Sequence, residues 1–408
     1  MISRTIGWFR QADWLTADRV LAYARIFVVV VALVSLVWIC LSKGLIDPAG
    51  HPIGTDFLNV YAAGLLVDQG HAAAAYDWPM HHAAEASVVA YDGYFGWHYP
   101  PMFLFLAAPL ALLPYALALA VYLALTGTAY LAAVARFLPP MPGRYWLVAG
   151  FPAVFVNLGH GQNGFLTTAL LATGLHSLSR RPIVAGLCLG CLAYKPQFAL
   201  LLPVALLAGR QLRPLVTAGL AAGLLALASW LVFGSSVWAA FFASLEPTRT
   251  IILEQGATGW EKIVSIFSAV RMLGGGLGIA YALQSATTLA AMAVVALVWW
   301  RGGRRNLAVG CLVLAIPLTT PYVLDYDLVV LVVAVVALAS DGIAHGFRPW
   351  EKITLAAVTL APILARGVGS AWHMPIVPAI LSVALIVFAA RAVAIPLEAA
   401  RGFAMVAE

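Results

Sequence analysis

The polar residues with the clearest capacity for chemistry begin at Asp56, in the stretch Gly54–Gly64 that reads GTDFLNVYAAG. A carboxylate with an ordinary pKa near about 3.9 is ionised at neutral pH and can accept a proton from an attacking hydroxyl. The same position, just ahead of a helix-like run, also suits an N-cap. Spacing alone leaves both interpretations of Asp56 open.

Two further stretches carry side chains suited to sugars or other hydroxyl-bearing ligands. His98 and Tyr99 precede two prolines, and aromatic rings there can either anchor at the bilayer interface or stack on a sugar face. Gln162 and Asn163 lie in a turn with three glycines, and their amides both donate and accept hydrogen bonds. A simple tight turn explains the second stretch equally well.

Four cations between apolar runs suggest contact with a phosphate. Lys195, in the sequence YKPQ with Gln197, falls between two apolar runs, where a lysine is costly and therefore a functional candidate. An ammonium there suits an anionic phosphate, although snorkelling to lipid headgroups competes. Three more candidates lie further along the chain, where a solvated surface is the alternative: Arg249, Lys262 and Arg271.

Asp325 and Asp327 are a close acidic pair between two later apolar runs. They can act as an acid pair, bind a cation or cap the following helix. No HExxH metal signature, P-loop or GxSxG elbow occurs in the sequence, and the GxGxxG spacing of residues 159–164 lies in a turn between apolar runs rather than in the strand–helix context of a dinucleotide fingerprint. We therefore expect no cofactor, with a divalent cation left open, and no chemistry driven by cytoplasmic ATP.

The elements that position these residues are apolar helices. Of the 408 residues, 63% are hydrophobic and only 10% are charged, against about a quarter charged in soluble proteins. We expect one all-α membrane domain over residues 1–408. Apolar runs, several shorter than the ~20 residues of a full span, fall at 21–41, 102–135, 145–158, 162–178, 182–194, 197–208, 214–233, 279–300, 306–319, 328–340, 353–367 and 376–393.

Counting 102–135 as one crossing predicts about twelve transmembrane helices, although Pro109 and Pro114 can split that run in two. With the N-terminus inside, 17 Lys and Arg residues fall on cytoplasmic segments and 6 on the other side. The positive-inside rule therefore predicts that both termini are cytoplasmic. A nucleic-acid partner is not expected, since the basic residues are scattered at helix borders.

Two long loops lie on the predicted outer side, at about 42–101 and 234–278. The first is rich in aromatic residues and short helical patterns, so we expect it to be folded. The cysteines all lie in apolar runs, and Cys188 and Cys191 in GLCLGC are typical of a helix-packing face rather than of redox chemistry. Disulfides are not expected.

Taken in order, these stretches resemble the membrane glycosyltransferases of family 87, which have the multi-spanning GT-C fold. The resemblance covers roughly residues 50–200, and the C-terminal half adds little to it. Its motifs are Asp56-Phe57 with Tyr61 and Gly64, Tyr76-Asp77, Tyr99-Pro100-Pro101 with Pro109-Leu110, Gly161-Gln162-Asn163 and Lys195-Pro196-Gln197.

The resemblance implies sugar transfer, with inversion, from a polyprenyl-phosphate donor to a lipid- or glycan-linked acceptor on the periplasmic face of a bacterial inner membrane. The family's catalytic aspartate maps to Asp56, and mannose is expected by association with the family. The chemistry then assigns roles to the other candidates. Lys195, Lys262, Arg249 and Arg271 would bind the phosphate, and Tyr99, His98, Gln162, Asn163, Gln197 and Asp325 the sugar or acceptor.

Two other classes of protein fit parts of the pattern. A secondary transporter or a flippase for lipid-linked sugars suits twelve crossings, but acids are nearly absent from the apolar runs, where ion-coupled carriers keep some. A non-catalytic partner in envelope polysaccharide synthesis is the other alternative. Transfer activity, with its loss in Asp56→Asn, separates an enzyme from both.

Overall fold

Seven long apolar helices form the frame of the molecule. The computed structural model describes residues 2–395, which fold into helices and connecting turns with only isolated β-bridges. The helices long and apolar enough to cross a bilayer are α2 (Ala17–Leu41), α6 with its extension η3 (Tyr115–Phe137), α13 (Leu212–Phe233), α16 (Leu277–Arg301), η7 with α18 (Asp325–His345), α19 (Glu351–Trp372) and α20 (Ile376–Val393). The chain is therefore a multi-pass membrane protein.

The other apolar runs fold as shorter helices, and prolines account for several breaks. Pro114 precedes α6, so the run 102–135 is divided in two, as its prolines allowed. The predicted number of twelve crossings stays a prediction. The shorter helices are η2 (Pro101–Phe103), α5 (Leu104–Ala111), α7 (Arg144–Ala149), α8 (Ala153–His160), α9 (Gly164–Ser177), α10 (Pro182–Cys191), η4 (Leu192–Tyr194), α11 (Pro196–Ala199), α12 (Leu202–Ala208), α17 (Arg305–Ala315) and η6 (Ile316–Thr319).

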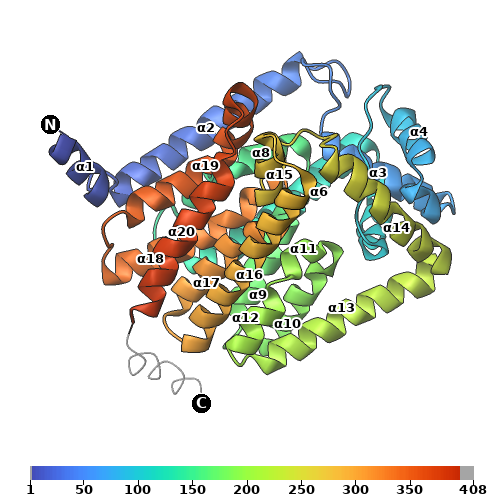
Figure 1. Ribbon diagram of the computed structural model, residues 1–408. Coiled ribbons are helices and arrows are strands. Elements are labelled where there is room, and N and C mark those ends of the chain that lie inside the picture. The colour runs from blue at the N-terminus through green and yellow to red at the C-terminus, as the bar shows by residue number, and fades with distance from the viewer. Residues whose placement is uncertain (1, 396–408) are drawn as a thin grey trace.

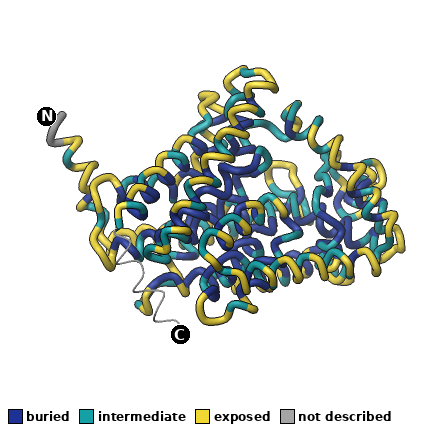
Figure 2. The backbone as a smooth tube through the Cα atoms, turned by 60° about the horizontal axis from the view of Figure 1, so that its bottom comes forward, coloured by how far each residue is buried: buried dark blue, intermediate teal, exposed yellow. Residues whose placement is uncertain are grey.

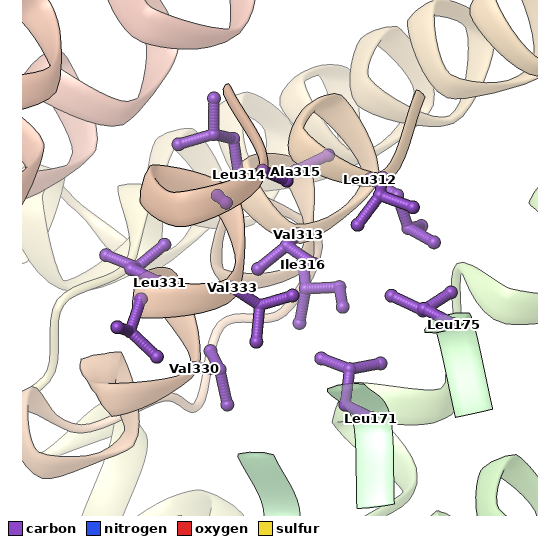
Figure 3. Close-up of a cluster of buried hydrophobic side chains, with 14 of the residues drawn as sticks. Leu171, Leu175, Leu312, Val313, Leu314, Ala315, Ile316, Val330, Leu331 and Val333 are labelled. Carbon is purple, nitrogen blue, oxygen red and sulfur yellow. The ribbon is translucent and has the colours of Figure 1, made fainter. Parts of the chain in front are cut away.

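The centre of the bundle is the pair α17 and α18. Residues Val309–Ala315 are buried without interruption, and α18 packs along them. Leu171 and Leu175 of α9 reach the same cluster of aliphatic side chains (Figure 3). Because η7 and most of α18 are buried, they hold Asp325 and Asp327, in the first turn of η7, at a fixed depth in the bundle.

The outermost long helices present apolar side chains outward. Only 6% of the apolar window of α2 and 11% of that of α13 is buried, against 67% for η7 with α18. Figure 2 shows the resulting pattern, with buried residues in the middle and exposed residues outside. In water these faces would be costly, so they are the surfaces that lipid covers.

The predicted packing face around Cys188 is formed by the glycines beside it. A Cβ on Gly186 would lie 2.4 Å from Thr217, and one on Gly190 would lie 2.5 Å from the carbonyl oxygen of Ala218. The two glycines therefore let α10 approach α13 closely. All four cysteines are free.

Both long loops contain helices. The first has α3 (Thr55–Asp68), η1 (Ala72–Tyr76) and α4 (Trp78–Val88), and the second has α14 (Ser235–Pro247), the π-helix η5 (Thr248–Glu254) and α15 (Ile266–Met272). In Figure 1, α3, α4 and α14 gather at the opposite end of the molecule from the short N-terminal helix α1 (Ile2–Gln11). Aromatic residues of the first loop have their own core with α5 and α6.

A buried ion network joins the ends of α18, α19 and α20. Arg391 lies 2.8 Å from Asp341 and also pairs with Glu351, and Arg304 lies 3.1 Å from Asp341. Asp341, Glu351 and Arg391 are each at most 2% exposed. The network fixes the end of α19 at Glu351, whereas Pro362 interrupts the hydrogen-bond ladder nearer its other end. Arg401, one of the 17 cations counted as cytoplasmic, lies outside the described residues.

Candidate functional site

Asp56 lies in the first turn of α3 and carries an unpaired carboxylate oxygen. The helix is capped by Gly54, so Asp56 is not its N-cap. The side chain is 19% exposed, and its Oδ2 is buried without a hydrogen-bond partner among the described residues. Free of a capping role, this oxygen can receive a proton from a ligand.

Burial raises the pKa of Asp56 from 3.8 to about 7, and the negative charge of Asp327 adds to the rise. Three cations reduce the effect: Arg366, Lys195 and Lys262. The residues that influence Asp56 thus come from η7, α19, the start of α11 and the second long loop. Segments far apart in the sequence converge around one carboxylate.

The turn after α8 packs directly against the start of α3. Gly161 has φ +61°, and a Cβ there would lie 2.8 Å from Cβ of Phe57, so only glycine fits this close approach. The preceding residue, His160, is thereby placed beside α3. Its Nδ1 lies 2.8 Å from Oγ1 of Thr55 and 3.5 Å from Oδ2 of Asp56.

Next to this turn, Gln162 and Asn163 are buried and joined to other candidates. Gln162 Oε1 accepts hydrogen bonds from the Tyr99 hydroxyl at 2.9 Å and from the Asn163 backbone N–H at 2.7 Å. Lys195 Nζ donates to Asn163 Oδ1 at 2.8 Å. The Nδ2 of Asn163 has no partner among the described residues, so one buried donor remains for a ligand.

Lys195 forms a buried ion pair with Asp327. Their side chains are 4% and 2% exposed, and Nζ of Lys195 donates to Oδ1 of Asp327. Oδ2 of Asp327 in turn accepts from the Leu324 backbone N–H at 3.2 Å. The charge of Lys195 is therefore already compensated within the protein.

Asp325 faces a different cation, Arg366 of α19. Nε of Arg366 donates to Oδ2 of Asp325 at 2.9 Å, and its NH2 lies 3.3 Å from Nε2 of His160. The Arg366 side chain is 38% exposed, which is far more than that of Lys195. A ligand can thus reach this guanidinium.

Lys262 lies beside the same cluster without a fixed partner. Its backbone carbonyl accepts a hydrogen bond from the Asp325 N–H at 3.0 Å, and a β-bridge joins Ile263 to Leu324. Its ammonium lowers the pKa of Asp56 but makes no ion pair in the described part of the chain. Lys262, which has no ion pair among the described residues, and Arg366, which is partly exposed, are consequently the cations that a ligand can contact.

Four candidates from the sequence make no hydrogen bond or ion pair with this cluster in the described part of the chain. Arg249 is 59% exposed and pairs with Glu254, and Arg271 donates to the Gly275 carbonyl and covers the Trp260 ring. His98 is joined to Thr248 at 3.0 Å, and burial lowers its pKa to about 4. Gln197 is half-buried and makes no side-chain hydrogen bond within residues 2–395.

Three residues of the cluster, His160, Thr55 and Arg366, were not candidates for the site, and Asp327 was considered only as part of an acidic pair with Asp325. His160 and Thr55 lie close to predicted residues in the sequence, and Asp327 lies two residues after Asp325. Arg366 is the only Lys or Arg that the sequence places on the predicted outer side in the last hundred residues. The assignment of Lys and Arg residues to the two membrane faces could therefore have identified Arg366 as a candidate. The role of His160 depends on a contact over 104 positions, which no local pattern reveals.

An apolar groove of about 870 Å³ lies next to the site but does not contain Asp56. It runs between η1 and α14 and includes Phe233, Val237 and Ala240. Tyr76 lines it and donates a hydrogen bond to the backbone carbonyl of Tyr99 at 2.9 Å. Within residues 2–395, no three His, Cys, Asp or Glu side chains are arranged to hold a metal ion.

A polar cluster with one unpaired carboxylate, enclosed in a bundle of lipid-facing helices, defines a membrane protein with a buried reaction or binding site. A sequence model of glycosyltransferase family 87 matches residues 97–321, more than half of the chain. The chain therefore belongs to glycosyltransferase family 87. Comparisons with curated proteins and with solved structures found no match.

The family match includes Tyr99, Gln162, Asn163, Lys195 and Lys262, whereas Asp56 precedes it and Asp325, Asp327 and Arg366 follow it. As a glycosyltransferase, the protein takes a sugar donor and an acceptor. Residues before, within and after the matched range 97–321 therefore lie together at one site.

Proposed function

We propose that the protein transfers a hexose, with inversion, from a polyprenyl-phosphate donor to a hydroxyl of a lipid- or glycan-linked acceptor. The acceptor oxygen attacks the anomeric carbon and forms the new glycosidic bond. The bond between that carbon and the phosphate oxygen breaks, and its electron pair leaves with the polyprenyl phosphate. Asp56 takes the proton of the acceptor hydroxyl.

The observation that carries this proposal is the state of Asp56. A general base works best when its pKa is near the working pH, and burial raises that of Asp56 to about 7. Its Oδ2 has no hydrogen-bond partner to displace among the described residues. A structural carboxylate at a helix start would instead be bonded to backbone N–H groups.

Negative charge on the departing phosphate requires cations, and we assign this role to Arg366 and Lys262. Both act on Asp56 electrostatically; Lys262 makes no ion pair among the described residues, and Arg366, although paired with Asp325, is 38% exposed, against 4% for Lys195. Preorganised cations at the site of developing charge stabilise a transition state. Lys195 instead fixes Asp327 and Asn163.

The sugar would lie against the amide side of the cluster. The unpartnered Nδ2 of Asn163 supplies a donor, and Gln162 and Tyr99 hold the turn that carries it. Mannose is the expected hexose by family association. The excess of Arg and Lys on the other loops supports a periplasmic site in a bacterial inner membrane with both termini cytoplasmic.

Transfer from a radiolabelled polyprenyl-phosphate sugar to membrane glycolipids tests the proposal. We expect Asp56→Asn to lower the rate by about 100-fold or more, because the base is lost. Asp68→Asn, at the exposed end of the same helix, is the matched control and should keep full activity. Equal rates for wild type and Asp56→Asn would refute the assignment, and substrate flux in liposomes without transfer would favour a carrier.

A further inference from the structure

His160 lies between Asp56 and Arg366, and its two ring nitrogens face them separately. Nδ1 lies 2.8 Å from Thr55 Oγ1 and 3.5 Å from Asp56 Oδ2, and Nε2 lies 3.3 Å from NH2 of Arg366. The imidazole is 26% exposed and packs against the Tyr326 ring. Each nitrogen thus has a defined neighbour of known hydrogen-bonding character.

These neighbours determine which nitrogen carries the proton. A guanidinium can only donate, so Nε2 must accept from Arg366. Burial, with a contribution from Arg366, lowers the pKa of His160 to about 4, so the ring is neutral at neutral pH. A neutral imidazole with an accepting Nε2 carries its hydrogen on Nδ1, the nitrogen that faces Thr55 and Asp56.

We infer that His160 is a positioning residue that presents the Nδ1–H donor to Asp56, and that Arg366 fixes it in this tautomer. In the free protein the nearer acceptor is Thr55, and the distance to Asp56 is longer than a hydrogen bond. Such contacts often shorten only when substrate is bound. The inference rests on the proposed role of Asp56 as the base.

The donor matters for Asp56 because it stabilises the ionised carboxylate. A hydrogen bond to the charged form lowers the pKa of a carboxyl group. It adds to the effects of the charges that face Asp56 from the surrounding elements, namely Asp327 on η7, Lys195 before α11, Lys262 in the second long loop, Arg366 on α19 and Glu85 on α4. His160 also orients the oxygen that must accept the proton.

Two substitutions separate the functions of the two nitrogens. In His160→Asn the amide nitrogen takes the place of Nδ1, so the donor toward Asp56 is kept and the contact with Arg366 is lost. In His160→Gln the amide oxygen can accept from Arg366, and the donor toward Asp56 is lost. The variants are matched controls, because each removes the ring and keeps one contact.

The pH dependence of transfer distinguishes positioning from a structural role. We expect the midpoint of the rising limb to move up by about 0.5–1 pH unit in His160→Gln, the equivalent of one hydrogen bond, and to stay near that of wild type in His160→Asn. Equal shifts in both variants, or none in either, would overturn the inference. Thermal unfolding of both variants checks that they are folded.

A second measurement does not depend on turnover. The difference between infrared spectra of wild type and Asp56→Asn isolates the protonated carboxyl band of Asp56, whose disappearance with pH gives its pKa directly. A higher pKa in His160→Gln than in His160→Asn supports the hydrogen bond from His160 to Asp56, whether or not Asp56 is the base. An unchanged pKa contradicts it, while Asp56→Asn activity tests the proposed function separately.

Discussion

Two charged side chains in the same cluster, Asp56 and Lys195, have opposite surroundings. Lys195 is neutralised by Asp327 and also donates to Asn163, as a structural charge in a low-dielectric interior requires. Asp56 is left without a partner for Oδ2. The sequence marks both as unusual, but only the contacts show which one has capacity left for a substrate.

The first prediction at the residue scale concerns pH. Because burial raises the pKa of Asp56 to about 7, the carboxyl group is protonated and inactive as a base below that pH. Transfer should therefore rise tenfold per pH unit in the acid range and level off above about 7. Initial rates at subsaturating donor between pH 5 and 9 measure the profile.

Asp56→Glu serves as the control, since it keeps the carboxyl group but changes its distance and burial. We expect a weaker rate with a displaced midpoint. A rate that is flat from pH 5 to 7 in wild type would show that the base is fully ionised there, contrary to the burial of Asp56.

The second prediction concerns the ion pair between Lys195 and Asp327. Removing one partner leaves the other charge buried and unpaired, which typically costs about 3–5 kcal/mol. Lys195→Met and Asp327→Asn should each lower the thermal unfolding midpoint strongly. The double variant should recover much of the loss, and a simple sum of the two effects would contradict the pairing.

The site could be predicted in part. Asp56, Gln162, Asn163, Lys195 and Asp325 were identified because polar residues between apolar runs on one side of a membrane are few. Arg249 and Arg271 fulfilled the same criterion and lie elsewhere. The charge pattern predicts on which membrane face a residue lies. The distance between two residues on that face depends on how the loops pack.

At the scale of elements, the first long loop is a small folded unit attached to α5 and α6. Within it, α4 presents Glu85 to the interior at 2% exposure, and the carboxylate accepts from the Phe95 N–H at 3.2 Å. Both nitrogens of His81, on the preceding turn, lack hydrogen bonds among the described residues. This interior is polar and sensitive to protonation.

The third prediction follows from Glu85. Burial raises the pKa of Glu85 from 4.5 to about 8, so the folded state holds its proton more tightly than the unfolded state does. The resulting stabilisation is fully present below about pH 4.5 and is lost as the pH rises through about 8. Glu85→Gln should lower the dependence of the unfolding midpoint on pH within this range.

The comparison between wild type and Glu85→Gln isolates the effect of Glu85, because Asp56 contributes equally to the pH dependence of stability in both proteins. Ser87→Ala, on the exposed part of α4, provides the matched control. An unchanged slope in Glu85→Gln would mean that Glu85 is ionised in the folded protein.

The helical secondary structure was predictable from the apolar runs, and the interruptions of helices were predictable where prolines occur. The lengths of the shorter helices were not. α17 spans eleven residues, and Leu307 and Val309–Ala315 within it are buried by neighbouring helices, so its apolar composition reflects the protein core rather than lipid. Hydropathy alone cannot separate these two environments, and this limits a count of crossings.

At the scale of the whole molecule, charge asymmetry makes the fourth prediction. In a cysteine-free variant, Asp92→Cys in the first long loop should react with a membrane-impermeant maleimide in intact cells. Arg180→Cys, exposed in the turn after α9, should react only after permeabilisation. The opposite pattern would put Asp56 on the cytoplasmic side and remove the proposed donor from its reach.

Pro362 divides helix α19 into a part held at Glu351 and a last part that carries Arg366. Glu351 is tied into the buried ion network, and Arg366 lies fifteen residues later, roughly 22 Å along the axis. Pro362 separates them, one turn before Arg366. A phosphate that binds the guanidinium would therefore shift only the part of α19 after Pro362. The part held at Glu351 would stay in place. Pro362→Ala should stiffen α19 at this position. A slower turnover in a protein of undiminished thermal stability would show that bending at Pro362 contributes to the reaction.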